Sequence, residues 1–273
     1  MTNVNRFRGD LLDGRFHGLN PSFANIEMIE SSSNSIHHGG TVQVRRAFRQ
    51  GFTLQGGWTF GKTIDDADEL VSITTYQDID HRRGNRGPAG FDAPQKLSLM
   101  GVWDLPVLRG QAGWLEKLAG GWQLAGFIIL QSVTPITVFH GAPWPRGDFN
   151  ADGTNSDRPH APAAGVRRGG WERADFLNGI FRAADFPLPA PGLNGDLGRN
   201  TFRGPGYAQA DVSLSKKLPL TEKVAAQLRA EAFNAFNRVN LNNPVSDLNN
   251  NNFGRTTSTL TPRVYQFGLR VQF

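Results

Sequence analysis

Large apolar side chains occupy every second position in several segments of this chain. In "GFTLQGGWTFGK", residues 51–62, the large side chains share one side: Phe52, Leu54, Trp58 and Phe60. The opposite side carries only small or polar residues. An alternation of period two predicts a β-strand with one apolar face.

The same alternation, with turn residues between the segments, predicts about eight strands: 23–33, 37–49, 51–63, 95–105, 121–134, 206–217, 223–236 and 262–273. Only "RQG" joins the second and third of them, which predicts an antiparallel hairpin. Segment 223–236, "KVAAQLRAEAFNAF", is ambiguous because Ala, Leu, Arg and Glu favour helices. The short turn "PLTEK" before it favours a strand.

The connections between the predicted strands differ in length at the two ends of the sheet. Short connections are "RQG", residues 106–120 and "PLTEK", whereas 64–94, 135–205 and 237–261 are long, polar and rich in Gly, Asn, Asp and Pro. Outer-membrane barrels have short periplasmic turns and long extracellular loops, with an apolar face on lipid and a polar face in the lumen. The sequence therefore predicts an all-β fold, an antiparallel transmembrane β-barrel segment in which the strands form a meander.

The predicted division is an irregular N-terminal segment, residues 1–22, followed by the C-terminal part of an outer-membrane barrel, residues 23–273. Aromatic residues near strand ends are expected to form girdles at the lipid headgroups. These residues are Trp58, Phe60, Trp103, Trp122, Tyr207 and Phe236.

Composition agrees with a strand-and-turn protein. Of 273 residues, 38% are hydrophobic, and 32 are Gly and 16 Pro. The chain has no Cys, which excludes disulfides and thiolate metal sites. The net charge is +5, but the arginines are scattered among acidic residues, so no nucleic-acid partner is expected. No apolar run reaches the length of a membrane helix, and the N-terminus lacks the apolar region of a signal peptide.

One loop, "DFNADGTNSDRP", is a candidate metal site, with Asp148, Asn150, Asp152 and Asp157 around a glycine. Its D-x-N-x-D-G start matches the opening of a calcium loop, where oxygen ligands alternate and a Gly allows a tight wrap. Position 12 is Pro159 instead of the usual Glu, and flanking helices are not predicted. A plain loop of Asx turns is therefore the favoured interpretation, and calcium is the alternative.

Other chemistry is sparse. The acidic run "DDADE", residues 65–69, is expected to be a solvated loop face. No Ser-His-Asp order and no Gly-rich phosphate loop in a strand-then-helix context are present. We therefore expect no enzymatic activity and no further cofactor.

The chain resembles the C-terminal part of Oar-like TonB-dependent transporters, from about residue 14 to Phe273, in the order of these motifs: "NPSFANI", "HHGGTVQVRRAFRQGFTLQGGWTFGKTIDDADE", "RGPAGFDAPQKLSLMGVWDLP", "GGWQLAGFIILQSVTPITV", "DFNADGTNSDRP" and "LRAEAFNAFNRVNLNNP…NNFGRTTSTLTPRVYQFGLRVQF". The resemblance implies a Gram-negative outer-membrane location and a transport function that depends on TonB. It also implies a large barrel whose signal peptide, TonB box, plug and earlier strands would lie outside this sequence. The expected partners are outer-membrane lipid, the barrel-assembly machinery, the rest of the barrel with its plug, and TonB.

The last strand, "PRVYQFGLRVQF", resembles the signal by which the assembly machinery recognises outer-membrane barrels. Its expected lipid face is Tyr265, Phe267, Leu269, Val271 and Phe273. Two alternatives to a transporter segment stay open: a complete eight-stranded outer-membrane barrel with a structural or adhesive role, and a soluble β-sandwich that binds calcium or carbohydrate through its loops. Gly57, Gly61, Ser213 and Ser215 point to the interior, and such small residues favour a wider barrel over a small one.

Overall fold

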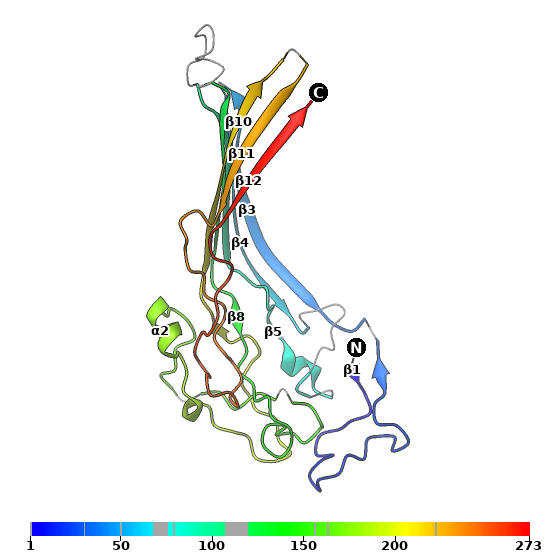
Figure 1. The fold of residues 1–273 in the computed structure, drawn as a ribbon. Coiled ribbons are helices and arrows are strands. Elements are labelled where there is room, and N and C mark those ends of the chain that lie inside the picture. Colours follow the sequence, from blue (N-terminus) through cyan, green and yellow to red (C-terminus); the bar gives the residue numbers. More distant parts are fainter. Residues whose placement is uncertain are drawn as a thin grey trace.

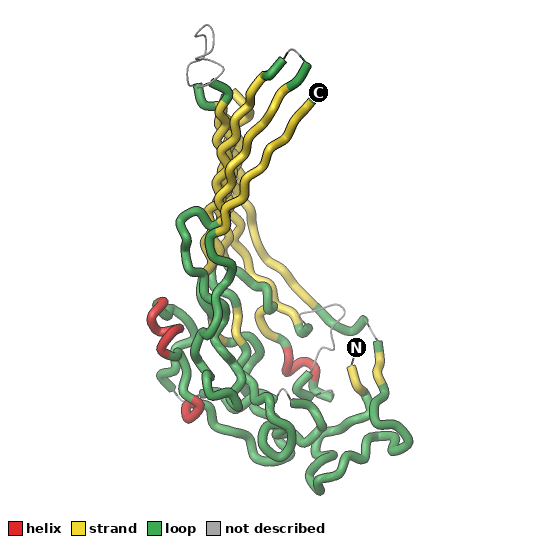
Figure 2. Tube along the Cα trace, viewed as in Figure 1, coloured by secondary structure: helices red, strands yellow, loops and turns green. Residues whose placement is uncertain are grey.

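The computed structural model describes residues 2–29, 31–49, 51–67, 76–78, 80–106, 120–155, 157–162, 164–221 and 223–273. Its main element is one antiparallel sheet in the order β12-β11-β10-β7-β6-β4-β3, with the short β5 paired to β4 (Figures 1 and 2). The strands are β3 (Ser35–Arg49), β4 (Phe52–Asp65), β5 (Gly87–Pro88), β6 (Gln95–Asp104), β7 (Trp122–Gln131), β10 (Tyr207–Pro219), β11 (Ala225–Phe233) and β12 (Val264–Gln272).

This sheet confirms the predicted all-β antiparallel fold. Segment 223–236, ambiguous in sequence, contains strand β11, and β3 and β4 form the predicted hairpin. The strand predicted at 23–33 is wrong in extent: within it only β2 (Glu27–Met28) is a strand, and it pairs with β1 (Thr2–Asn3) outside the main sheet. The reason lies in the pattern, because Phe23 and Ile29 share a side with Asn25 and Glu27, so neither face is consistently apolar.

The strand register places apolar and polar side chains on opposite faces of the sheet. One row of partners crosses six strands on the apolar face: Phe52, Trp103, Leu124, Leu214, Ala230 and Phe267. The row one residue further along lies on the other face and is mostly polar: Thr53, Val102, Ala125, Ser213, Glu231 and Gln266. A one-residue slip would exchange the two faces, so the apolar pattern fixes the register.

The apolar face is bare in the described part of the chain. Val44 is 65% exposed and Phe267 is 79% exposed, and no second sheet packs over them. A soluble β-sandwich would bury these residues between two sheets, so the β-sandwich alternative is wrong.

Aromatic residues mark two levels of the apolar face. At one level Trp58 is aligned with Leu97 and Leu130, and at the other lie Trp103 and Trp122. Eight residues of β7 separate Leu130 from Trp122, which is roughly 26 Å along the strand at about 3.3 Å per residue. Tyr207 does not belong to this girdle, because its partner Gln131 lies on the polar face.

The connections gather at two ends of the sheet, which we call the loop end and the turn end. Figures 1 and 2 show the long connections together at the loop end, beside β1, β5 and β8. They contain η1 (Arg82–Asn85), β8 (Pro135–Ile136), α2 (Arg173–Asn178), η2 (Ala183–Asp185) and β9 (Phe202–Arg203). Among the residues described, no helix combines the length and the apolar character that crossing a membrane requires.

The long connections have a hydrophobic core of their own. It consists of Ile136, Val138, Phe181, Phe186, Leu197, Phe202 and Phe253. Phe181 and Phe202 pack edge to face with ring centroids 4.7 Å apart. The loop end is therefore a packed structure that holds its polar side chains in fixed positions.

Candidate functional site

The four residues predicted as a metal site lie together at the loop end. Asp148, Asn150, Asp152 and Asp157 are each at most 1% exposed. The sequence predicted their proximity from the turn residues between them. Their deep burial could not be predicted, because it depends on segments far away in the sequence.

Hydrogen bonds to the backbone wrap this loop around its own side chains. The two carboxylate oxygens of Asp148 accept from the N–H groups of Asp152 (3.0 Å) and Gly153 (2.7 Å). Asp152 accepts in turn from the N–H of Thr154 at 2.9 Å. Gly153 has a φ of +89°, a conformation that glycine adopts without strain. Asn150 Oδ1 also accepts from the Asp152 N–H at 3.0 Å. The bonds to Asn150 and Asp152, each from the N–H two residues further on, are Asx turns.

Asp157 closes the loop from its far end. Its Oδ2 accepts from the N–H of Asn150 at 2.8 Å, whereas its Oδ1 has no hydrogen-bond partner. Burial raises the pKa of Asp157 to about 8, the hydrogen bond from Asn150 opposes this, and the charges of Asp152 and Asp148 add to it. Burial also raises the pKa values of Asp148 and Asp152. The loop thus gathers three carboxyl groups in a buried place, where desolvation favours their protonated, uncharged forms.

The N-terminal segment covers the loop, which sequence reasoning missed. The N–H groups of Gly9 and Leu11 donate to the carbonyls of Asn150 (2.7 Å) and Ala151 (2.8 Å). Arg6, 8% exposed, places Nη1 3.9 Å from Asp152 Oδ1. No local pattern indicates contacts across such a distance in sequence.

The carboxylates do not by themselves form a ready coordination sphere. Within the residues that the structure describes, no group of three or more His, Cys, Asp or Glu side chains is arranged to hold a metal ion. A cation at this loop would therefore need amide or main-chain oxygens as well, which calcium accepts. Whether calcium binds here stays a prediction.

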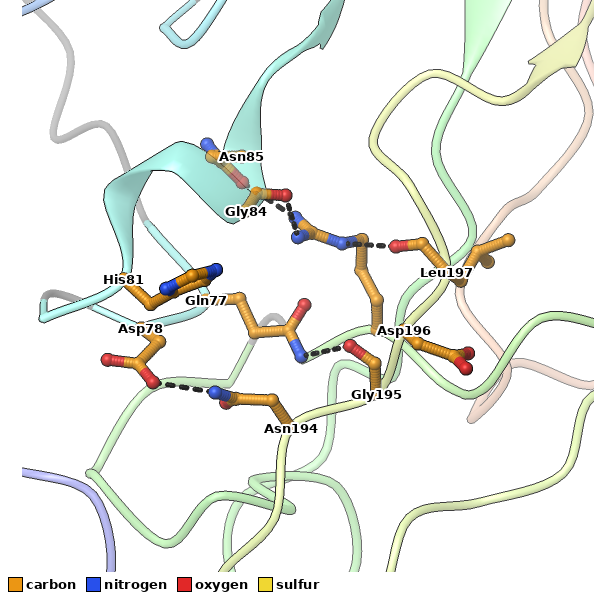
Figure 3. A pocket seen from close by; sticks show the side chains of 10 residues that line it. Gln77, Asp78, His81, Gly84, Asn85, Asn194, Gly195, Asp196 and Leu197 are labelled. Atoms are coloured by element: carbon orange, nitrogen blue, oxygen red, sulfur yellow. Dashed lines mark hydrogen bonds between the residues drawn. The ribbon is translucent and has the colours of Figure 1, made fainter.

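A cavity of about 310 Å³, lined mainly by residues with polar side chains, lies beside this loop, between the η1 region and residues 194–197 (Figure 3). Arg158 forms one wall by donating to Leu197 O (2.7 Å), Asn85 Oδ1 (2.6 Å) and Gly84 O (3.0 Å). On the other side Gln77 donates to Gly195 O at 3.1 Å, and its Oε1 has no partner.

The loop and the cavity share hydrogen bonds through one amide. Asn150 Nδ2 donates to the carbonyl of Gln77 and to Asn194 Oδ1 at 3.1 Å. Asn194 then donates to Asp78 Oδ2 at 2.6 Å (Figure 3). A change in the loop would therefore reach the cavity directly.

Asp65, the first residue of the acidic run 65–69, does not lie on the solvated face that the composition of the run indicates. Asp65 is 2% exposed and forms an ion pair with Arg199, which is 7% exposed. Asp68 and Glu69 lie outside the described residues. The sequence could not predict this ion pair, because Arg199 is distant from Asp65 in the sequence and its "LGRN" context matches no motif.

The last strand presents the predicted lipid-side residues on its apolar face. Tyr265, Phe267, Leu269 and Val271 pair with β11 positions of the same face, and they are between 49% and 79% exposed. Phe273 follows the strand and is fully exposed. Within the described residues β12 pairs only with β11, so its outer edge is open.

A sheet with one apolar face and with its long connections at one end is typical of the family whose model matches nearly all of this sequence. The family model is described as outer membrane beta barrel domain, and it matches residues 7–266. The chain belongs to this family. The barrel domain therefore lies in the outer membrane, with its apolar face toward lipid.

The comparison with solved structures gives a match of low similarity. It is P. aeruginosa FpvA in complex with a heterologous pyoverdine and iron, with 13% sequence identity and a TM-score of 0.38. The match covers 99% of the present chain and 23% of that chain, so the barrel domain spans less than a quarter of its length. No curated protein matches the chain in sequence.

Proposed function

We propose that this barrel domain supplies C-terminal strands to a larger outer-membrane transporter of the TonB-dependent, Oar-like type. The observation that carries the proposal is the pair of open sheet edges. β3 and β12 end the described sheet, and neither has a partner on its outer side. In hydrocarbon each backbone N–H and C=O needs a partner, so both edges require further strands or each other.

The polar face of the sheet supports a wide lumen. Gly57, Ser98 and Ser213 lie on it, together with the charged Arg45 and Asp211. An eight-stranded barrel has an interior just wide enough for its side chains to fill. The small residues Gly57, Ser98 and Ser213 would leave gaps in so narrow an interior, whereas a wide lumen can contain water beside them.

In this proposal the long loops face the exterior, the plug occupies the lumen, and TonB supplies energy from the inner membrane. The barrel-assembly machinery recognises β12. The domain itself has no catalytic role and no nucleic-acid partner. The sequence resemblance supports the transporter type, and the family supports the barrel and its membrane.

Cysteine pairs test how the barrel closes, because the chain has no Cys of its own. Single replacements at Thr41, Gln43 and Arg45 in β3 are combined with replacements at Gln266, Gly268 and Arg270 in β12. The tagged chain is produced in the bacterium that encodes it, and disulfides are measured after mild oxidation of outer membranes. The pair Glu231→Cys and Gln266→Cys joins register partners in β11 and β12, so it is the positive control.

We expect the control pair to form a disulfide and all nine β3–β12 pairs to fail. A β3–β12 disulfide as abundant as the control would show that the seven long strands of the sheet close on one another, and it would overturn the proposal. Energy coupling has a separate test with Ser98→Cys, whose side chain lies on the polar face. Its labelling by a membrane-impermeant maleimide should be slower in a strain that lacks TonB, and equal rates would contradict a TonB-dependent role.

A further inference from the structure

The loop 148–155 with Asp157 holds more carboxylates than the neighbouring cations offset: Arg6 lies near Asp152, and the charge of Arg158 acts on Asp157. Three carboxylates and the Asn150 amide lie in this stretch, and all four side chains are buried. Arg6 approaches only to 3.9 Å. The hydrogen bonds of Arg158 go to two backbone carbonyls and one amide oxygen, not to a carboxylate.

One oxygen of this set lacks any partner. Asp157 is 0% exposed, one of its carboxylate oxygens accepts the Asn150 N–H, and the other, Oδ1, accepts nothing. An ionised carboxylate that is removed from water without a partner costs several kcal/mol. The atom therefore indicates either a bound proton or a bound cation.

We infer that this loop binds a calcium ion. The carboxylates of Asp148, Asp152 and Asp157 do not form a metal-holding group by themselves, so the amide oxygen of Asn150 and main-chain carbonyls complete the ligand set around those carboxylates that reach the ion. The inference does not depend on the transport proposal, because it rests on the loop alone.

The chemistry of the oxygens favours calcium among common cations. Calcium takes six to eight oxygen ligands in flexible geometry and accepts carboxylate, amide and carbonyl oxygens together. Magnesium requires near-ideal octahedral geometry and retains several waters, but the loop is closed to water by the N-terminal segment at Gly9 and Leu11. The backbone already wraps the loop as a D-x-N-x-D-G calcium sequence requires, with Gly153 at the tight turn.

The ion would stabilise more than its own loop. Asn150 joins the loop to Gln77 and to Asn194 at the cavity, and the N-terminal segment is hydrogen-bonded to residues 150 and 151. Calcium would thus hold three separate segments of the loop end together.

The test compares calcium-free and calcium-loaded protein. The full chain is purified in detergent, stripped with EGTA and titrated with CaCl₂ or MgCl₂ in a calorimeter, while trypsin cleavage of the loops is timed in parallel. The variants are Asp157→Asn and Asp148→Asn, which preserve side-chain size. Asp13→Asn is the control, because its side chain is 58% exposed and lies outside the loop.

We expect one calcium ion per chain, cleavage at least fivefold slower with calcium, and at least tenfold weaker binding in both loop variants. Asp13→Asn should behave like the natural protein. Heat-modifiable migration on gels confirms that each barrel is folded, and if one loop variant fails to fold, the other decides. Absence of calcium binding up to 10 mM, an equal response to magnesium, or unchanged affinity in a folded loop variant would each overturn the inference.

Discussion

The charged residues that matter most at the loop end are buried ones. Arg199 donates from Nε to Asn85 O and from Nη2 to Asp65 O, both at 2.8 Å, and forms an ion pair with the Asp65 side chain. Asp65 ends β4, so this one guanidinium attaches the long loop 132–206 to the sheet. The more exposed ion pair between Arg182 and Asp185 lies within one loop and does not attach that loop to the sheet.

Arg199→Met is expected to destabilise the loop end by about 3–5 kcal/mol, because it removes one member of a buried ion pair with Asp65. Arg182→Met is the matched control and should cost less than about 1 kcal/mol, since that pair is exposed to solvent. The measurement is the urea concentration at which trypsin begins to cleave residues 132–206. Equal midpoints for the two variants would contradict the role assigned to Arg199.

At this scale the sequence predicted what is local and missed what is distant. Asp148, Asn150 and Asp152 could be grouped because they lie within five residues of one another. Arg6, Gln77 and Arg199 could not, because their partners lie more than 100 residues away. Ion pairs and caps between loops leave no periodic signal in a single sequence.

Among the elements, strands with one apolar face were predictable and short or mixed ones were not. β11 is rich in residue types that favour helices. Its pairing with β10 and β12 nevertheless places Leu228 and Ala230 on the apolar face of the sheet. Tertiary context thus overrides helix propensity. The short pairs β1–β2 and β8–β9 follow no alternation and exist because the loops pack on one another.

The two faces of β6 should respond differently to the same substitution. Leu99→Arg, in the middle of the strand on the lipid side, is expected to destabilise the barrel by about 2–4 kcal/mol, the cost of a cation near the bilayer midplane. Ser98→Arg is the control on the polar face and should be nearly neutral. Urea unfolding in lipid vesicles measures both, and an equal loss would show that the faces are misassigned.

β12 should be sensitive on its apolar face only. Phe267→Asp, or deletion of Phe273, is expected to reduce the amount of barrel assembled in the outer membrane severalfold, because the apolar alternation of the last strand is broken. Gln266→Asp changes the neighbouring residue on the polar face and serves as the control. Membrane fractionation with heat-modifiable migration gives the assembled fraction, and normal assembly of Phe267→Asp would contradict an assembly role for this face.

For the molecule as a whole, alternating loop length was the most informative property of the sequence. It predicted a barrel segment with all long loops at one end, and Figure 1 shows that arrangement. It did not predict that these loops would build a core of seven buried apolar residues. Such a core comes from single aromatic residues, Phe181, Phe186, Phe202 and Phe253, that are scattered over more than 70 positions of polar sequence.

On the proposed orientation, with the long loops outside the cell, that phenylalanine core determines which surface antibodies encounter. Loops that fold on one another present patches assembled from several segments, and their contiguous peptides are partly turned inward. Antibodies raised against synthetic peptides from residues 132–206 are therefore expected to bind intact bacteria weakly, because the folded loops differ from the peptides used as immunogen. An immunogen that preserves the folded loop end, with the packing of Phe181 against Phe202 and Phe253 intact, would display the discontinuous epitopes that an intact cell exposes.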